Sequence, residues 1–234
     1  MQADGRNASL SEFVPPPHPA AQPIRSAILQ PLSADRHGAD LFDAQAGQDG
    51  LWTYMPYGPF LSRSDHHAWM ARAEASTDPV FLAILDPGTG RAGGHASFLR
   101  IDQANGVIEI GHILLTPFLQ RGRTASAALM AMIAWAMGQG YRRVEWKCNA
   151  LNIPSRRAAL RLGFTYEGTF RNHMIVKGEN RDTAWFSITD ADWRALAPAH
   201  AAWLDDANFD ADGRQRQSLS DLTGRALPGR DGAA

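Results

Sequence analysis

The sequence predicts one mixed α/β domain with a largely antiparallel sheet, a single β-α-β crossover and helices on both faces. Two observations support this. Short apolar runs alternate with turn-forming clusters in the middle of the chain, and the pattern then changes to that of a helix before strands return. The chain has 234 residues, of which 44% are hydrophobic, so it can bury a substantial core.

Three strands joined by tight turns open the predicted sheet. Residues 80–85 form an apolar run, and residues 86–90 supply the Pro and Gly typical of a turn. Residues 94–101 and 107–115 continue as strands, with a second turn at 102–106. Strands with such short connections are antiparallel neighbours, so this part is a meander.

Helices and further strands follow the meander and also precede it. Residues 125–137 are rich in Ala, Leu and Met and end at Gly138, which predicts a buried helix. Ser62 precedes another predicted helix with a residue type that caps helices. The remaining predictions are helices at 35–42, 65–75 and 154–162, and strands at 143–148, 164–170 and 183–189.

Three regions are expected along the chain. Residues 1–23 contain a proline run and predict a flexible leader, residues 24–197 the α/β domain, and residues 198–234 a C-terminal extension, partly helical with a disordered end. The leader lacks the apolar stretch of a secretory signal. The longest apolar segment has 13 residues, against the ~20 that cross a bilayer, so no membrane partner is expected. The single cysteine, Cys148, fits a small buried residue in a reduced cytoplasmic protein.

Charge is concentrated in the middle of the chain. The stretch from Gln120 to Arg181 carries 11 basic and 3 acidic residues, whereas the rest carries 12 and 21. These arginines either lie on solvated faces or bind an anionic ligand. The loop after the strand at 107–115 favours the ligand, because residues 120–125 open a helix whose backbone N–H groups suit a phosphate.

Two motifs resemble the GNAT superfamily of acyl-CoA-dependent N-acetyltransferases, in the branch of the RimJ/RimL-type ribosomal-protein acetyltransferases. Gln120 and Ala125 match the ends of its phosphate loop, Q/R-x-x-G-x-G/A, although Arg123 replaces the usual glycine. Asn152 and Ser155 begin a segment similar to the family's N-x-x-S…A…G-F pattern. Residues 108–112, Tyr166-Glu167-Gly168, Arg171 and Asp182 also match, so the likeness spans about residues 24–222.

This resemblance implies a GNAT-like acyl-CoA N-acyltransferase fold, with the sheet splayed between its fourth and fifth strands. It implies acetyl-CoA as co-substrate and no metal. Gly122 and the charges of Arg121 and Arg123 are expected to compensate for the lost glycine. The residues expected to hold the coenzyme are Ile113, Leu114, Leu115, Gln120, Arg121, Gly122, Arg123, Thr124, Ala125, Ser126, Asn152 and Ser155.

Acetyl transfer to an amine needs a base, a stabilised oxyanion and a proton for the leaving thiolate. Glu109 is the first candidate for the base, because it interrupts an apolar strand, where burial would raise its pKa. The alternative is a carboxylate that pairs with a neighbouring arginine. His112 is the reserve base, and strand alternation predicts that it points to the opposite face. By resemblance, Ser155 donates the proton or positions the sulfur.

Four aromatic residues separated by prolines precede the domain's first predicted strand. They either line the acceptor pocket or pack in the core, and they are Trp52, Tyr54, Tyr57 and Phe60. The acceptor is expected to be a primary amine, either a protein N-terminus or a small molecule. We expect direct transfer in a ternary complex, by a monomer or a homodimer.

Two other functions remain open from the sequence. Arg123 in the phosphate loop is compatible with a non-catalytic acyl-CoA-binding module. The basic middle of the chain is compatible with nucleic-acid binding, but a net charge of −1 gives the molecule no overall bias toward that partner. The pyrophosphate of coenzyme A accounts for the same arginines, so no nucleic-acid partner is expected.

Overall fold

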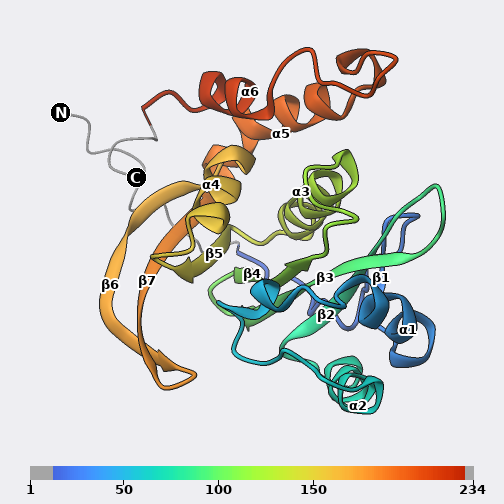
Figure 1. Ribbon diagram of the computed structural model, residues 1–234. Helices are drawn as coiled ribbons and strands as arrows, with labels where there is room; N and C mark the ends of the chain where they lie inside the picture. The colour runs from blue at the N-terminus through green and yellow to red at the C-terminus, as the bar shows by residue number, and fades with distance from the viewer. Residues whose placement is uncertain (1–12, 230–234) are drawn as a thin grey trace.

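The computed structural model describes residues 13–229, and a seven-stranded sheet lies at its centre (Figure 1). The strand order is β1-β2-β3-β4-β5-β7-β6, and neighbours are antiparallel except for the parallel pair β4 and β5. The mixed sheet predicted from the sequence is therefore confirmed. The strands are β1 (Leu29–Pro31), β2 (Val80–Leu85), β3 (Ala92–Asp102), β4 (Val107–Leu115), β5 (Arg143–Asn149), β6 (Thr165–Val176) and β7 (Glu179–Thr189).

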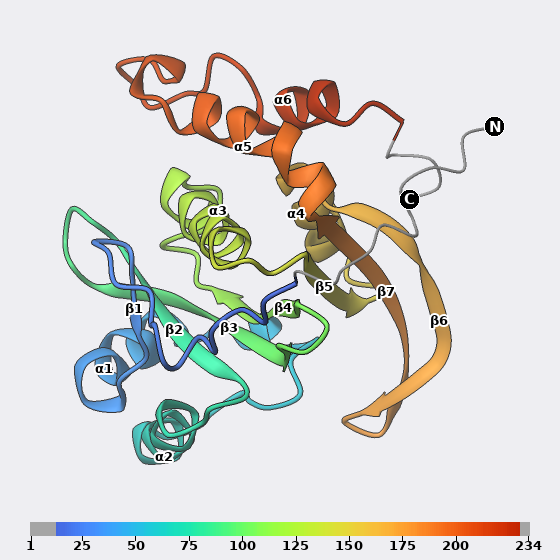
Figure 2. The same ribbon diagram turned by 180° about the vertical axis from the view of Figure 1, so that it is seen from behind.

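Helices cover both faces of the sheet, as Figures 1 and 2 show from opposite sides. The helix α3 lies against one face, with α4, α5 and α6 nearby, and α1 and α2 lie against the other. The helices are α1 (Ala34–Ala44), α2 (Arg63–Glu74), α3 (Arg123–Gly138), α4 (Ile153–Leu162), α5 (Asp190–Leu204) and α6 (Leu219–Ala226), with short 3-10 turns η1 (Asp49–Trp52) and η2 (Asp206–Asn208).

The main core forms between the sheet and α3. Alternate residues of β4, Ile108 and Ile110, are fully buried against this helix, as period-two side chains on a covered face should be. Ala128 and Met132 on α3 are equally inaccessible to solvent. Small residues let the helix approach the sheet closely, so this packing fixes the beginning of α3 relative to the end of β4.

The C-terminal segment belongs to the same core. The predicted boundary at residue 197 falls inside α5, which begins with a capping box between Thr189 and Asp192. Trp203 of α5 and Leu219 of α6 are both buried in the main core. The predicted disordered end at residues 230–234 lies outside the described residues.

Part of the predicted leader is packed rather than free. Gln103 donates its side-chain amide to the carbonyl of Pro16, and the Tyr141 hydroxyl donates to the carbonyl of Pro17. Pro16 and Pro19 are buried, and the two hydrogen bonds hold the segment against the β3–β4 turn and the loop before β5. Residues 1–12 of the predicted leader lie outside the described residues.

The parallel strands β4 and β5 separate soon after they meet. Their pairing covers only residues 107–109 of β4 and 143–145 of β5. Both strands continue past this point, to Leu115 and Asn149, while β4 remains paired with β3 on its other side. The result is an opening between the two strands, with Glu109 at its closed end. The splayed sheet that the family resemblance implied is therefore present.

Candidate active site

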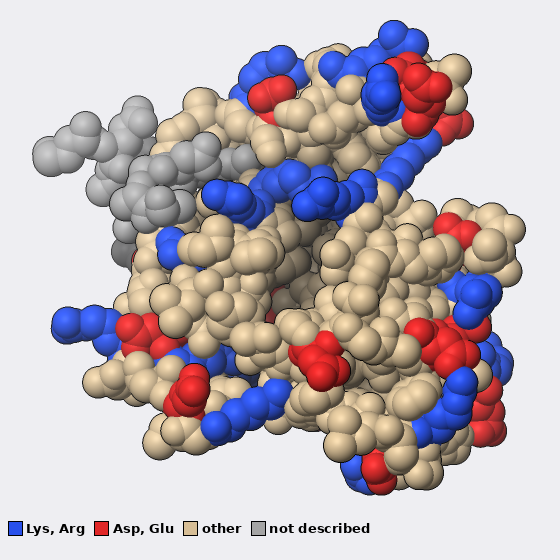
Figure 3. All heavy atoms as spheres, viewed as in Figure 1, with Lys and Arg blue, Asp and Glu red and all other residues tan. Residues whose placement is uncertain are grey.

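The opening between β4 and β5 leaves main-chain groups of β4 without a strand partner on that side. Gly111, Leu114 and Leu115 pair with β3, and none of residues 111–115 pairs with β5 in the part of the chain that the structure describes. Figure 3 shows a hollow at the middle of the molecule, with a row of Lys and Arg side chains along its upper side. The open strand edge can accept an extended ligand as an added strand.

A bulge in β4 changes where its side chains point. Ser97 of β3 pairs with Gly111, but His95 pairs with Leu114, so β4 holds one extra residue between the two pairs. His112 takes the extra position, with a φ of 49°. Its ring contacts Phe81, which lies on the same face as Gly111 and Glu109. The prediction that His112 points away from Glu109 is therefore wrong, because the bulge breaks the alternation.

The His112 ring is held by Tyr57. The two rings are stacked with an interplanar angle of 12°, and Nδ1 lies 3.1 Å from the tyrosine hydroxyl. Burial lowers the pKa of His112 to about 4, and the nearby Arg100 and Arg181 contribute to that shift. The imidazole is therefore neutral at pH 7 but weakly basic.

Glu109 is buried and paired with two cations. Its Oε2 lies 3.1 Å from Lys147 Nζ and 3.2 Å from Arg100 Nε. Burial raises the pKa of the carboxyl, and Lys147 and Arg100 oppose that shift. Glu109 therefore has the ion pairs of the structural alternative as well as the raised pKa expected of a base. Glu109 can accept a proton only if an incoming amine or water reaches the oxygens that the cations leave open.

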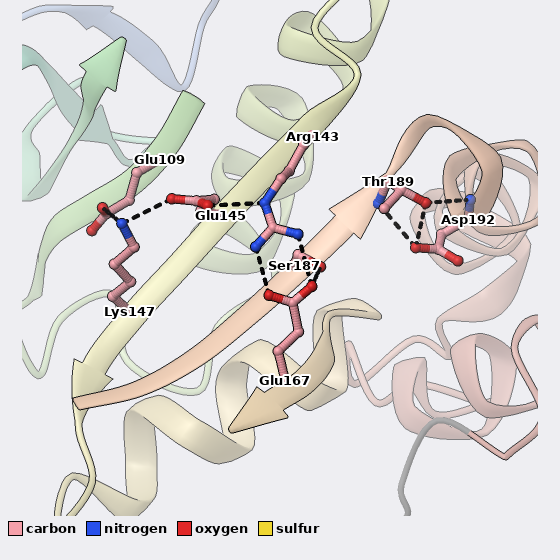
Figure 4. Close-up of polar contacts among 8 residues, drawn as sticks. All are labelled: Glu109, Arg143, Glu145, Lys147, Glu167, Ser187, Thr189 and Asp192. Atoms are coloured by element: carbon pink, nitrogen blue, oxygen red, sulfur yellow. Dashed lines mark hydrogen bonds and ion pairs between the residues drawn. The ribbon is translucent and has the colours of Figure 1, made fainter. Parts of the chain in front are cut away.

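A series of ion pairs runs from Glu109 on β4, across β5, to Glu167 on β6 (Figure 4). Lys147, whose side chain is 5% exposed, also lies 2.8 Å from Glu145. Arg143 binds Glu145 at 2.9 Å and donates a hydrogen bond to each carboxylate oxygen of Glu167. The Glu167 carboxylate also accepts a hydrogen bond from the Ser187 hydroxyl. These contacts lock the β4–β5–β7–β6 order at the closed end of the opening.

The other wall of the opening begins at α4. Asn152 caps this helix by accepting from the backbone N–H of Ser155 at 3.1 Å. The Ser155 hydroxyl accepts from the indole N–H of Trp146 at 3.0 Å and lies beside the Cys148 thiol. Cys148 is buried, as predicted, and burial raises the pKa of its thiol. The serine is held with its O–H still able to donate.

The residues of the predicted phosphate loop fall into two sets: those that face the loop and those whose side chains bind other parts of the protein. Gly122 is the N-cap of α3, and no side chain caps this helix, so its first N–H groups face the loop. Gln120 donates to the carbonyl of Leu115, and the exposed Arg121 has a φ of 60°. Thr124 and Ala125 lie in the first turn and supply further N–H groups.

Arg123 and Ser126 have other partners. The Arg123 guanidinium binds Asp206 at 2.8 Å and the carbonyl of Leu204, and it lies 4.3 Å above the Phe209 ring. Ser126 is buried and accepts from Arg161 at 2.8 Å. Their side chains therefore hold the C-terminal segment and α4, and only the backbone of Arg123 faces the loop. The expected charge compensation by Arg123 does not agree with this placement.

The aromatic loop crosses from one side of the opening to the other. Tyr54 donates its hydroxyl to the carbonyl of Leu151 before α4, and Lys177 of the β6–β7 hairpin donates to the carbonyl of Trp52. Trp52 is buried, and its ring lies against Gly58, where a Cβ would come within 2.4 Å of it. Phe60 packs edge-on against Trp52. The loop therefore packs in the core and also contacts the segment before α4 and the β6–β7 hairpin.

Sequence reasoning missed three basic residues of the site: Arg100, Lys147 and Arg181. A signal for Lys147 existed, because Glu145 and Lys147 alternate with apolar residues in β5 and so share one face. Arg100 and Arg181 carried no comparable signal, since their positions depend on how β3 and β7 curve.

Comparisons with known proteins agree with this architecture. Residues 27–165, more than half of the chain, match the model of the acetyltransferase (GNAT) domain family. A GCN5-related N-acetyltransferase from Brucella melitensis is 42% identical with a TM-score of 0.86, covering 89% of this chain and 97% of that one. A probable GNAT-family acetyltransferase from Chromobacterium violaceum is 37% identical with a TM-score of 0.75, covering 83% and 99%.

A curated relative is the Bacillus subtilis (strain 168) protein YdaF, provisionally named a ribosomal N-acetyltransferase. It is 26% identical over 175 residues, which cover 73% of this chain and 93% of YdaF. Taken with the splayed sheet and the uncapped start of α3, the family match is decisive. The chain belongs to the GNAT acetyltransferase family, whose members use acetyl-CoA.

Proposed function

We propose that the protein is an acetyl-CoA-dependent N-acetyltransferase that transfers the acetyl group directly to a primary amine in a ternary complex. One observation carries the proposal: the open edge of β4 leads from the uncapped start of α3 to a buried carboxylate, Glu109. This edge offers a path for a long, extended donor with phosphates at one end and a reactive group at the other.

The main chain supplies most of the donor site in this proposal. The N–H groups at Gly122 to Ser126 bind the pyrophosphate, with the helix dipole in support. The backbone of Ile113, Leu114 and Leu115 pairs with the pantetheine arm, and the Asn152 side chain adds an amide contact. Gln120 fixes the end of β4 through Leu115, and the exposed Arg121 adds positive charge beside the phosphates. No metal is part of the proposal.

Glu109 takes the proton from the incoming ammonium, through a water molecule, and the free amine then attacks the thioester carbonyl. A backbone N–H of the β4 edge stabilises the oxyanion. The nitrogen of the tetrahedral intermediate loses its extra proton to solvent through the same water path. As the C–S bond breaks, the Ser155 hydroxyl gives its proton to the departing thiolate and recovers one from solvent, so the products are the amide and the free thiol. His112 is oriented by Tyr57 and, with its low pKa, serves better as a neutral wall of the site than as the base.

The aromatic loop forms the acceptor side of the pocket. Tyr57 and Phe60 are half-buried and lie against the same face as Glu109, with Trp52 behind them and Tyr54 at the rim. The name of YdaF favours a protein N-terminus as acceptor, and a small amine also fits. The described residues include no helix long and apolar enough to cross a membrane. We place the enzyme in the cytoplasm, as a monomer or homodimer, with neither nucleic acid nor membrane as partner.

Calorimetry with acetyl-CoA, followed by mass spectrometry of an amine panel, tests the proposal. We expect acetyl-CoA to bind and at least one amine to gain an acetyl group. Coenzyme binding without turnover on any amine would favour a non-catalytic acyl-CoA-binding module, a function that the double ion pairing of Glu109 also allows. Failure of folded protein to bind acetyl-CoA would contradict both functions.

A further inference from the structure

Arg181 forms none of the hydrogen bonds or ion pairs described above. It is a residue of β7, where it pairs with Met174 of β6. On the other side, the pairing of β7 with β5 ends at Thr183 and Asn149. At Arg181, β7 therefore has a strand neighbour on one side only, and the other side borders the opening.

The Arg181 side chain reaches toward β4. It interacts electrostatically with Glu109 and with His112, both on β4, and with Cys148 at the end of β5. In the sheet, β5 separates β7 from β4. Strand register gives the face: Trp185 pairs with Lys147, Glu145 pairs with Glu109, and Arg181 lies four residues before Trp185, so its side chain is on the face of the sheet that carries Glu109.

This guanidinium has no carboxylate partner within the described part of the chain. Its Nε is buried without a hydrogen-bond partner, whereas Arg100 and Lys147 share Glu109. The four cations of the site exceed its carboxylates by one; the cations are Arg100, Arg143, Lys147 and Arg181, and the carboxylates are Glu109, Glu145 and Glu167. A partly buried cation without a counterion is costly, so the site is suited to an incoming negative charge.

A second unused donor lies on the same face of β7. Trp185 is four residues after Arg181, so the two side chains share a face, and its buried indole N–H has no hydrogen-bond partner in the structure. Lys147 Nζ lies 3.7 Å from the centre of the Trp185 ring, and Phe170 packs against it at 4.8 Å. Phe170 also borders an open depression of about 880 Å³ on the β6–β7 hairpin. Arg181 Nε and the Trp185 indole N–H thus give this face of β7 two donor groups without a hydrogen-bond partner among the described residues.

We propose that Arg181 binds a carboxylate of the acceptor, which is then a small amine of the amino-acid type. This inference rests on the proposed function, because Glu109 positions the amine while Arg181 holds the carboxylate a few bonds away. Arginine pairs with a carboxylate through two parallel N–H···O bonds, which would orient the amine as well as bind it. The added negative charge would also balance the surplus cation of the site.

A protein N-terminus fits this arrangement less well. The α-carboxyl of an N-terminal residue is part of a neutral peptide bond, so Arg181 would remain without a counterion. Sites built to bind a charged polar group discriminate strongly against analogues that lack it. We expect free acids to be preferred over the corresponding carboxamides by roughly 10- to 100-fold.

Binding of product-like probes tests this preference before the acceptor itself is identified. Calorimetry on the full chain with coenzyme A would compare N-acetyl-L-leucine and N-acetyl-L-phenylalanine with their carboxamides. We expect the acids to bind at least tenfold more tightly, Arg181→Met to remove the difference, and Arg181→Lys to keep part of it. Arg72→Met, on the exposed surface of α2, is the matched control and should keep the full preference.

The outcomes separate this inference from the proposed function. If acids and carboxamides bind alike, if neither class binds, or if Arg181→Met keeps the preference, the carboxylate site is contradicted. Acetylation of a peptide N-terminus at a rate that Arg181→Met does not change would contradict it too. In each case acetyl-CoA binding together with acetylation of the amine panel, measured on the same samples, shows whether the proposed acetyltransferase function still stands.

Discussion

Glu109 combines two properties that oppose each other, burial and a double ion pair. Burial raises the pKa of its carboxyl, while Lys147 at 3.1 Å and Arg100 at 3.2 Å favour the ionised form. Glu109→Gln keeps the shape and removes the basic oxygen. We expect kcat to fall roughly 100-fold or more, as for the loss of a general base. Glu179→Gln, on the exposed β6–β7 hairpin, is the control in the same acetyl-transfer assay.

The pH dependence of wild-type activity should also report the ionisation of Glu109. A base must be ionised, so kcat/KM falls as the pH drops through its raised pKa. This acid limb should be absent from the residual activity of Glu109→Gln. An unchanged profile and unchanged kcat would remove Glu109 from the mechanism.

The two cations beside Glu109 should move this acid limb. Arg100→Met removes a half-exposed partner, so the pKa of Glu109 should rise and the limb should shift to higher pH, with the protein still folded. Lys147→Met should shift it further and lower the free energy of unfolding by about 3 kcal/mol, because it removes a nearly buried cation from Glu109 and Glu145, each of which keeps one other partner. A shift to lower pH in either variant would contradict this electrostatic account.

The residues of the site were only partly predictable. Local sequence patterns identified three of them: Glu109 interrupts an apolar strand, and Asn152 and Ser155 belong to the N-x-x-S motif. The helix cap at Asn152 is present in the structure. The position of His112 was not predictable by alternation, because a single extra residue in β4 turns its ring to the face of Glu109. Arg181 shares a face with Glu109 only through the pairing of β7 with β5 and of β5 with β4, a property of the whole sheet.

Among the elements, the beginning of α3 connects the predicted donor site with the C-terminal segment. Sequence reasoning gave Arg121 and Arg123 the same role, but the structure separates them. Arg121 is exposed at the loop, whereas Arg123 binds Asp206 and lies over Phe209. The two arginines should therefore give different phenotypes.

Arg121→Glu should raise the KM for acetyl-CoA several-fold, because it places a carboxylate beside the phosphates. Arg123→Ala should change the acetyl-CoA Kd by less than about threefold while lowering the free energy of unfolding by about 1 kcal/mol, since it removes an exposed ion pair and a cation–π contact. Calorimetry and chemical unfolding measure the two effects. Reversed phenotypes would mean that the Arg123 side chain, rather than that of Arg121, faces the phosphates.

Element boundaries followed the sequence closely where a cap or a turn marks them. The helix after Ser62 and the strand at 107–115 agree with expectation, because a cap and flanking turns mark their ends. The strand β1 was missed, since three residues carry no periodic signal. Residue 197, the predicted domain boundary, falls inside α5, and apolar residues that join this helix to the core continue past it.

At the scale of the whole molecule, buried histidines should make stability depend on pH. Burial lowers the pKa of His66 to about 4 and that of His95 to about 3, from the ordinary value of 6.5. A depressed histidine pKa means that the unfolded chain binds protons first as the pH falls. Stability is therefore complete above about pH 7.5 and is lost as the pH falls from there toward the folded pKa values.

Chemical unfolding at pH 7.5 and pH 5 measures this loss. We expect on the order of 2 kcal/mol for each of the two histidines at pH 5. His95→Leu suits the aromatic surroundings of the ring and should remove the contribution of His95 to this loss of stability. Equal stability of the wild type at both pH values would contradict the burial of these neutral rings.

The central claim is that the splayed edge of β4, with the start of α3, receives the coenzyme. Hydrogen exchange followed by mass spectrometry measures this directly, since the contacts are made by main-chain N–H groups. With saturating coenzyme A, we predict slower exchange in the segment 111–126 and little change in α1 and α2. Unchanged exchange in that segment, with coenzyme binding verified by calorimetry on the same sample, would contradict the account.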